Sequence, residues 1–317
     1  MGDSRDRQTR LGIRAAVAMS TVLVGLCGLC AGASATPPGK NGELLISSFL
    51  EQEDGNNASS VYKTTLAGKS TFLLKGSTAA SFSEPAVSPN GKNIAYSLYP
   101  GYQLWLGPLG KPAKAKALTE ADPDVNASEP VFSPDGKYIY FSEKFYLESG
   151  TSWYLKRYTI KTKKTKSYKL NAKLDYGLSD ISPNGRLVAF GRGEDDHASQ
   201  TFLLDTKTGK ARKFKSKGPA MELNFSPDGK SVAYSAPVKE GFQVFTAKLN
   251  GKGVKRRSRG EAINYRPVWS PDGKQIAYTH GLDELKKIGI FNLKTGKTKY
   301  IATPGSYARV DQWLLKR

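Results

Sequence analysis

The chain has 317 residues, with 48 lysines and arginines against 28 aspartates and glutamates, and a formal net charge of +20. It holds only two histidines and two cysteines. These numbers exclude a fold held by several disulfides and a metal centre of three histidines, and they favour anionic surroundings or partners.

The first 35 residues have the pattern of a secretory signal peptide. Four arginines precede an apolar run over 15–31, and Ala33-Ser34-Ala35 forms a small-x-small cleavage site. Cleavage would remove both cysteines and leave a net charge of +18, because the leader holds four arginines and two aspartates. We expect a secreted or extracytoplasmic protein, facing the cell wall or periplasm, with no membrane span after cleavage. An uncleaved single-span anchor is the alternative.

A short motif, Ser-Pro-Asp/Asn-Gly-Lys/Arg, organises the rest of the chain. Its five copies begin 45, 49, 44 and 44 residues apart, at Ser88, Ser133, Ser182, Ser226 and Ser270. Proline presets a type I turn, and glycine takes the left-handed position that lets two antiparallel strands leave with the right twist. An apolar run follows each turn, as in a strand covered on both faces. This period, with a hairpin in each unit, is typical of a β-propeller blade.

Strands are predicted in chain order as six groups. The first group is incomplete and covers 41–48, 61–66 and 71–74. The second covers 85–87, 94–98, 103–106 and 115–118, and the third 130–132, 138–142, 153–159 and 165–170. The fourth covers 179–181, 187–190, 201–205 and 211–214. The fifth covers 223–225, 231–235, 243–248 and 254–257, and the sixth 267–269, 275–279, 288–292 and 298–301.

The segment 308–317 supplies the strand that the first group lacks. Trp313 corresponds to Trp269 and Phe225, the residues that precede the serine of two turns. We therefore predict an all-β fold: a six-bladed propeller of four-stranded antiparallel blades over 36–317. The ring would close by pairing the C-terminal strand with the N-terminal strands, with no second domain.

The Ser-Pro-Asp-Gly-Lys units resemble the TolB-like β-propeller repeat, also called the WD-like repeat, of secreted and periplasmic bacterial proteins. The resemblance covers about residues 41–317 and implies the architecture. Propellers of this kind serve as binding platforms, as accessory domains of peptidases and as sugar-active enzymes. Two departures limit what it implies, because we find neither the additional N-terminal domain of TolB nor the hydrolase domain of the prolyl-oligopeptidase-like relatives.

Charge separates between the two faces of the predicted disc. The turns between strands one and two and between strands three and four lie on one face, which we call the turn face. The lysines of these turns make this face basic, and we predict polyanion binding by eight in the turns between strands three and four: Lys161, Lys163, Lys164, Lys207, Lys210, Lys252, Lys294 and Lys297. The alternative is that lysines on the fourth strands protect exposed sheet edges from aggregation.

The opposite face is acidic and is the usual ligand side of propellers. Aligning the first strands places six residues at equivalent positions near the channel mouth: Glu84, Glu129, Leu178, Glu222, Arg266 and Val310. The three glutamates and Arg266 are predicted to bind a cation or a small polar ligand. The alternative is that they are solvated or paired. Asp122, Asp124 and Asn126 have calcium-loop spacing, but Ala127 and Ser133 replace the glycine and the distal glutamate.

No catalytic residue is assigned. His197 and His280 are the only histidines, and no Gly-x-Ser-x-Gly elbow exists. We expect a non-catalytic, monomeric binding or scaffold protein for an unidentified protein or an anionic envelope polymer rather than nucleic acid. No cofactor or metal site is assigned, a calcium ion in the channel or loop being the one open case. The alternative is a carbohydrate-active enzyme that uses the channel carboxylates, since carboxylate-pair chemistry needs only two such groups.

Overall fold

A computed structural model describes residues 36–51, 57–77, 79–148, 150–168, 170, 175–193, 200–216, 218–239, 241–281 and 287–317. The predicted signal peptide and His197 fall outside the described residues. Within those ranges, no helix is long and apolar enough to cross a membrane.

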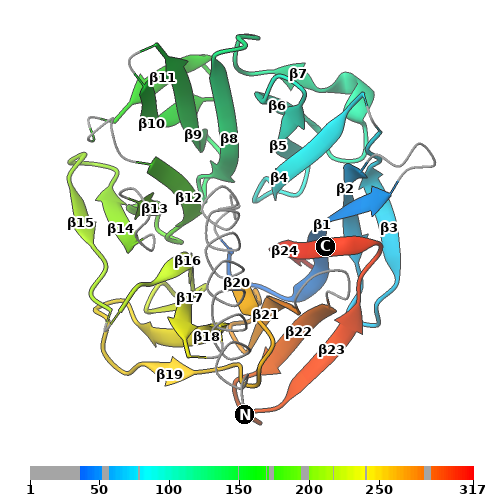
Figure 1. The fold of residues 1–317 in the computed structure, drawn as a ribbon, viewed down its shortest axis with the longest axis vertical. Coiled ribbons are helices and arrows are strands. Elements are labelled where there is room, and N and C mark those ends of the chain that lie inside the picture. The colour runs from blue at the N-terminus through cyan, green and yellow to red at the C-terminus, as the bar shows by residue number, and fades with distance from the viewer. Residues whose placement is uncertain are drawn as a thin grey trace, which may run out of the picture.

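Six four-stranded antiparallel sheets surround a central axis (Figure 1), so the predicted six-bladed propeller is confirmed. The first blade is closed by strands from both ends of the chain: β24 (Ser306–Leu315), β1 (Asn41–Glu51), β2 (Asn57–Thr64) and β3 (Ser70–Leu74). The second contains β4 (Ser81–Val87), β5 (Asn93–Tyr99), β6 (Gln103–Pro108) and β7 (Lys116–Ala117), with a 3-10 turn η1 (Pro112–Lys114) before β7. The third contains β8 (Val125–Phe132), β9 (Tyr138–Leu147), β10 (Gly150–Thr159) and β11 (Lys164–Ser167).

The other three blades keep the same order from the axis outward. The fourth contains β12 (Asp175–Ile181), β13 (Leu187–Gly193), β14 (Gln200–Asp205) and β15 (Ala211–Lys213). The fifth contains β16 (Met221–Phe225), β17 (Ser231–Val238), β18 (Gly241–Lys248) and β19 (Lys255–Arg256). The sixth contains β20 (Asn264–Trp269), β21 (Gln275–His280), β22 (Lys287–Asn292) and β23 (Thr298–Ala302).

Ring closure follows the prediction. In Figure 1 the red β24 lies beside the blue β1, and the two strands pair antiparallel with Leu44 opposite Trp313 and Ile46 opposite Val310. The Trp313 indole is fully buried and donates a hydrogen bond from Nε1 to the Gly42 carbonyl oxygen, 3.2 Å away. The last strand is therefore fixed both by its ladder and by its largest side chain.

Each Ser-Pro turn is held by its own serine. The Ser133 hydroxyl donates to Asp135 Oδ1 (2.7 Å) and accepts from the Tyr138 N–H (2.9 Å), while Asp135 Oδ1 also accepts from the Lys137 N–H. The turns at Ser88, Ser182, Ser226 and Ser270 repeat this pattern. The motif thus satisfies the polar groups of a tight turn locally, which explains why serine and Asp/Asn recur at this spacing.

Small and large residues alternate across the junctions between blades. Ala95 of the second blade packs with Phe132 and Phe141 of the third. Ala277 of the sixth blade lies in one cluster with Trp313 of the first. An alanine in the middle of a second strand therefore leaves room for an aromatic ring of the next blade, which keeps the packing dense.

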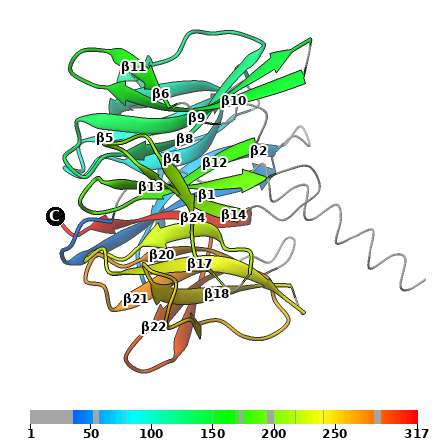
Figure 2. The same ribbon diagram turned by 90° about the vertical axis from the view of Figure 1, so that its left-hand side faces the viewer.

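The inner strands are longer than predicted because their ends on the face opposite the turns carry polar residues. The largest difference is in the third blade, where β9 and β10 project from the disc at the upper right of Figure 2. Glu143, just beyond the predicted strand 138–142, lies inside β9 and is buried against Lys156 of β10.

Candidate functional site

A bulge in the first strand places the predicted channel residues. Glu84, Glu129, Glu222 and Arg266 have φ angles of 52°, 58°, 52° and 54°, and the pairing register shifts at each of these positions. Non-glycine residues rarely adopt this left-handed region, so the conformation costs energy that the surroundings must offset. Glu84, Glu129 and Arg266 are buried, with exposed fractions of 6%, 4% and 4%.

The three glutamates bind the backbone of the neighbouring blade. Glu84 Oε2 accepts from the Glu129 N–H (2.8 Å), and Glu129 Oε2 accepts from the Leu178 N–H (2.6 Å). Glu222 Oε2 accepts from the Arg266 N–H (2.8 Å). The carboxylates of Glu129 and Glu222 also accept from a serine hydroxyl of the second strand of the same blade, at 2.8 and 2.7 Å. Each glutamate therefore joins two blades near the axis.

Other side chains make the same kind of link at the remaining junctions. Asp180 Oδ2 accepts from the Phe225 N–H (2.7 Å), and Gln312 Oε1 accepts from the Val87 N–H (2.8 Å). Thr279 Oγ1 accepts from the Val310 N–H (3.1 Å). Asn224 adds a second link at the Glu222 junction by accepting from the Trp269 N–H (2.8 Å). Every blade junction thus has a side-chain oxygen on one blade and a backbone N–H on the next.

Two arginines lie between these carboxylates. Arg266 Nε is 3.5 Å from Glu222 Oε1, and Arg266 Nη1 is 3.7 Å from Asp311 Oδ1. Arg309 Nε is 3.2 Å from the same Asp311 oxygen, and Ser47 donates to Asp311 Oδ2 (2.6 Å). This axial cluster connects the fifth, sixth and first blades. The alternative that the channel glutamates are paired therefore describes Glu222 well.

Burial dominates the electrostatics of the axial groups. It raises the pKa of Glu84 and of Asp311, against the opposing effect of Arg309 on both. Burial also raises the pKa of Asp180 well above its usual range, although the Phe225 and Ile181 N–H groups oppose the shift. For Arg309 the pKa falls, first through burial and then through the nearby Arg266 charge. Removing water thus disfavours the charged form of each group.

A small cavity lies beside the axial cluster. Its volume is about 20 Å³, room for one or two water molecules, and it is bordered by Arg266, Glu222, Asn224 and Asp311. Among the described residues, no group of three or more His, Cys, Asp or Glu side chains is arranged to hold a metal ion. In the segment with calcium-loop spacing, Asp122 Oδ1 instead accepts from the Asp124 N–H (2.9 Å) and closes a turn.

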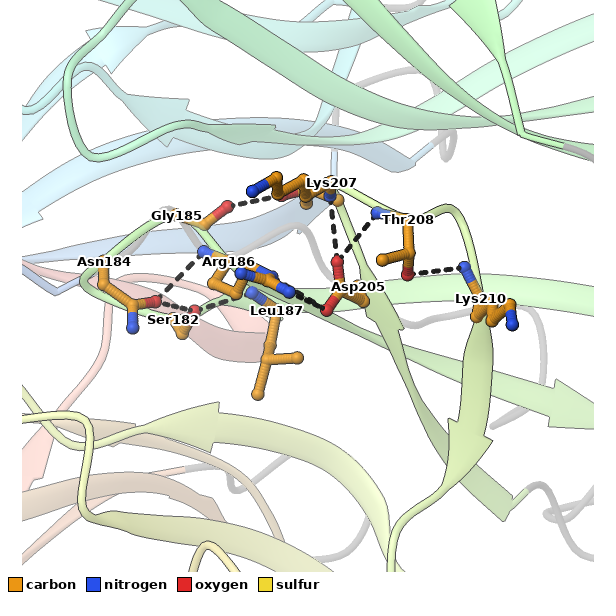
Figure 3. Close-up of polar contacts among 10 residues, drawn as sticks. Ser182, Asn184, Gly185, Arg186, Leu187, Asp205, Lys207, Thr208 and Lys210 are labelled. Carbon is orange, nitrogen blue, oxygen red and sulfur yellow. Dashed lines mark hydrogen bonds and ion pairs between the residues drawn. The ribbon is translucent and has the colours of Figure 1, made fainter.

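The turn face carries the eight lysines proposed for polyanion binding, and all eight are exposed. Figure 3 shows the turn that carries Lys207 and Lys210. Asp205 Oδ1 accepts from the N–H groups of Lys207 and Thr208, and Arg186 binds Asp205 Oδ2. The hydrogen bond from Arg186 also holds the pKa of Asp205 below its ordinary value. Asn292 accepts from the Lys294 and Thr295 N–H groups in the same way.

The carboxylate of Asp205 is therefore bound by backbone N–H groups and by Arg186, so the ammonium groups of Lys207 and Lys210 face the solvent. Within the described ranges, none of the eight lysines forms an ion pair.

His280 is the last residue of β21. Its Nδ1 is 2.7 Å from Asn264 Oδ1, and its ring lies 4.4 Å from that of Tyr300. Burial, followed by the Lys287 charge, lowers the pKa of His280. An amide and a tyrosine, rather than a serine and a carboxylate, are thus its neighbours.

Sequence reasoning placed the glutamates and Arg266 but missed other residues that link blades or pair at the axis, among them Asp180, Asn224, Thr279, Arg309, Asp311 and Gln312. A signal for some of them was available. Once Trp313 is aligned with Trp269 and Phe225, Gln312 falls in one column with Asn224 and Asp180, and all three link blades. No comparable pattern marks Arg309, because its counterparts are Ser83, Ser128, Gly177, Met221 and Tyr265.

Comparison with known proteins agrees with the architecture. The family model described as the TolB beta propeller domain matches residues 128–309. No curated protein matches the chain.

Among solved structures, TolB from Acinetobacter baumannii is 19% identical, with a TM-score of 0.69 over 86% of this chain and 67% of that one. A putative TolB from Agrobacterium tumefaciens is 15% identical, with a TM-score of 0.59 over 86% and 99%. An oligogalacturonate lyase from Vibrio parahaemolyticus is 14% identical, with a TM-score of 0.58 over 87% and 79%. At these identities the likeness shows the fold and does not choose between binding and catalysis.

Proposed function

Because the chain belongs to the TolB beta propeller domain family, we propose that it is a secreted or cell-surface scaffold that binds without turnover. Residues 1–35 would direct it out of the cytoplasm and then be removed. Its turn face would hold it on an anionic envelope polymer or an anionic lipid surface. The propeller would act there as a monomer.

The observation that carries this proposal is that the channel glutamates are hydrogen-bonded to the neighbouring blades. A general acid or nucleophile must reach the reacting atoms of its substrate. Glu84, Glu129 and Glu222 instead direct Oε2 at a backbone N–H of the next blade, at 2.6–2.8 Å. Binding a ligand through these atoms would break the links between blades. The surfaces left for recognition are the two outer faces of the disc.

The lysines of the turn face suit a dense polyanion. They are exposed and lie on short turns fixed by Asp205, Asn292 and Asn250. Because the Debye length is about 8 Å at physiological salt, only direct contacts with closely spaced anionic groups gain much. Several lysines on adjacent turns meet that condition together. Retention on such a surface should therefore fall steeply as salt is raised.

The test compares two sets of four lysines with equal charge. Lys207, Lys210, Lys294 and Lys297 are replaced together by glutamine in one variant. The control replaces four exposed lysines of the fourth strands: Lys116, Lys166, Lys213 and Lys299. Both variants lose four charges, so net charge alone predicts equal effects.

The measurement is binding to vesicles of anionic phospholipid and to purified cell walls at about 0.05 to 0.3 M salt. We expect the turn variant to lose at least tenfold more affinity than the control at low salt. Equal losses would reassign the lysines to general solubility or edge protection, and retention that ignores salt would overturn the tethering proposal.

The second candidate is a carbohydrate-active enzyme that uses the channel carboxylates. The raised pKa of Glu84 favours it, since a general acid must hold its proton near neutral pH. The test replaces Glu84, Glu129 and Glu222 by glutamine and measures reducing-end release from acidic and neutral polysaccharides. Turnover by the native protein that disappears in this folded variant would support the enzyme. Absence of turnover in both the native protein and the variant would favour the scaffold proposal over the enzyme.

A further inference from the structure

Three exposed tyrosines gather on the face opposite the turns, where the second and third blades meet. Tyr99, Tyr102 and Tyr146, which we call the tyrosine patch, are 48%, 39% and 42% exposed. Tyr99 ends β5, Tyr102 precedes β6, and Tyr146 lies near the end of β9. A cluster of exposed aromatic side chains marks an interaction surface more often than single exposed apolar residues do.

The patch is a built structure. The rings of Tyr99 and Tyr102 meet edge to face, with centroids 5.3 Å apart and planes at 69°. Tyr102 has a positive φ of 39°, and its carbonyl oxygen accepts from the Ala127 N–H (2.8 Å) at the start of β8. A strained non-glycine residue held by a neighbouring blade indicates that the ring is positioned.

The same segment of β8 also positions Tyr146. The Tyr146 N–H donates to the Asp124 carbonyl oxygen (2.8 Å), and Asn126 Nδ2 donates to the Tyr146 hydroxyl (3.1 Å). Burial raises the pKa of Tyr102, with smaller contributions from Tyr99 and Tyr146, as expected for three phenols on one surface. The start of β8 thus holds rings from two blades on its two sides.

One tyrosine of the patch already holds a cation. Lys144 Nζ lies 4.7 Å from the ring centroid of Tyr146 and 4.7 Å from that of Trp153. An ammonium group over aromatic rings at this distance is attracted by their electron-rich faces. The rings of Tyr99 and Tyr102 have no such lysine or arginine among the described residues.

The rim of the patch is acidic on a strongly basic protein. Asp122 and Asp124 are exposed between the two tyrosine-bearing blades, and Glu120 and Glu148 are exposed nearby in sequence. In the described part of the chain, none of these four carboxylates forms an ion pair. The patch therefore combines open ring faces with negative charge, which complements a cation rather than an anion.

We propose that the tyrosine patch binds lysine or arginine side chains of an extended, positively charged segment of a partner protein. The site goes beyond the proposed function, because it uses the other face of the disc. A scaffold held by its turn face would present this patch away from the anionic surface. The cation would lie against Tyr99 and Tyr102, with Asp122 and Asp124 as its charge partners.

The test measures fluorescence anisotropy of a labelled peptide with four arginines spaced by glycine, added to the mature protein at about 0.15 M salt. A peptide with citrulline at the same positions reports binding without charge, and a neutral hexasaccharide is used as competitor. The variant Tyr99→Leu/Tyr102→Leu keeps apolar surface but removes the two aromatic rings proposed to contact the cation. The control is Phe72→Ala, which removes an aromatic ring that is 50% exposed on the first blade.

We expect the arginine peptide to bind at least tenfold more tightly than the citrulline peptide. The double leucine variant should lose about tenfold, as two exposed cation–π contacts of roughly 0.5–1 kcal/mol would give. Asp122→Asn/Asp124→Asn should lose a similar factor, and Phe72→Ala none.

Equal binding of the two peptides, or equal losses in the leucine and Phe72 variants, would overturn the proposal. Competition by the hexasaccharide that the leucine variant abolishes would make the patch a sugar site, which also overturns it. Vesicle retention through the lysines is measured separately, so failure of either proposal is recognised without the other.

Discussion

Replacing Glu129 by alanine tests the role of the channel glutamates most simply. Glu129 is 96% buried and accepts hydrogen bonds from the Leu178 N–H (2.6 Å) and the Ser142 hydroxyl (2.8 Å). Alanine would leave both donors without this acceptor. Hydrogen bonds to a charged group contribute about 1.5–3 kcal/mol each, so for two such bonds we expect a loss of about 3–6 kcal/mol in the free energy of unfolding. The strain of the positive φ does not contribute to this loss, since alanine and glutamate are both strained there.

The assay is urea unfolding at pH 7, followed by tryptophan fluorescence, with amide hydrogen exchange at Leu178 as a local readout. Glu129→Gln keeps an oxygen acceptor and should lose only about 1 kcal/mol. Glu261→Ala, at an exposed glutamate, should change stability by less than about 0.5 kcal/mol. A Glu129→Ala variant as stable as Glu261→Ala, with unchanged protection at Leu178, would refute the idea that the glutamates link blades.

The other stability predictions concern a buried carboxyl, a hairpin glycine and the closing strand. Burial raises the pKa of Asp180, so its contribution to stability is present at low pH and is lost as pH rises through the raised pKa. As pH rises from 5 to 8, the native protein should therefore lose stability that Asp180→Asn does not lose, so the difference between their free energies of unfolding in urea should shift in favour of the variant. A difference that stays constant with pH would contradict this. A Cβ at Gly251 would lie 1.6 Å from the Lys215 carbonyl oxygen, whereas Gly253, also at positive φ, has room. Gly251→Ala should thus lower stability by about 2–3 kcal/mol more than Gly253→Ala, and equal midpoints would contradict the packing. Trp313→Ala should lose about 3–5 kcal/mol and speed amide exchange in β1, and slow exchange there would count against closure by β24.

The architecture could be predicted because the information is local and repeated. Each Ser-Pro turn satisfies its own polar groups, and the residue before its serine is buried in every complete copy: Val87, Phe132, Ile181, Phe225 and Trp269. Trp313 continues that column without a turn after it, which was enough to predict closure between the two ends of the chain. The ends of the inner strands were missed because polar residues such as Glu143 pair there with other side chains.

The positions of the channel glutamates could be predicted from the sequence, but their role could not. Alignment placed Glu84, Glu129 and Glu222 at one position, and the structure gives them one common role in binding the next blade. That role depends on the positive φ of the bulge, which no residue type in these positions signals. Asp311 was missed because its partner Arg266 comes from another blade, and Arg309 was missed because no repeated residue type marks its position.

The tyrosine patch was missed for a related reason. Tyr99 and Tyr102 are near in sequence, but Tyr146 joins their surface only because β9 is longer than its apolar run and pairs with the start of β8. The register of a projecting hairpin, rather than composition, brings the patch together.

One variant with two readouts tests most directly the claim that the channel glutamates hold the ring while binding uses the outer faces. Glu84, Glu129 and Glu222 are replaced together by glutamine, and urea unfolding and binding to anionic vesicles are measured on the same sample. We expect this variant to unfold at a lower urea concentration than the native protein, yet to bind vesicles with native affinity and salt dependence while it is folded. Native stability together with lost binding would contradict it, because the glutamates would then serve the ligand and not the fold.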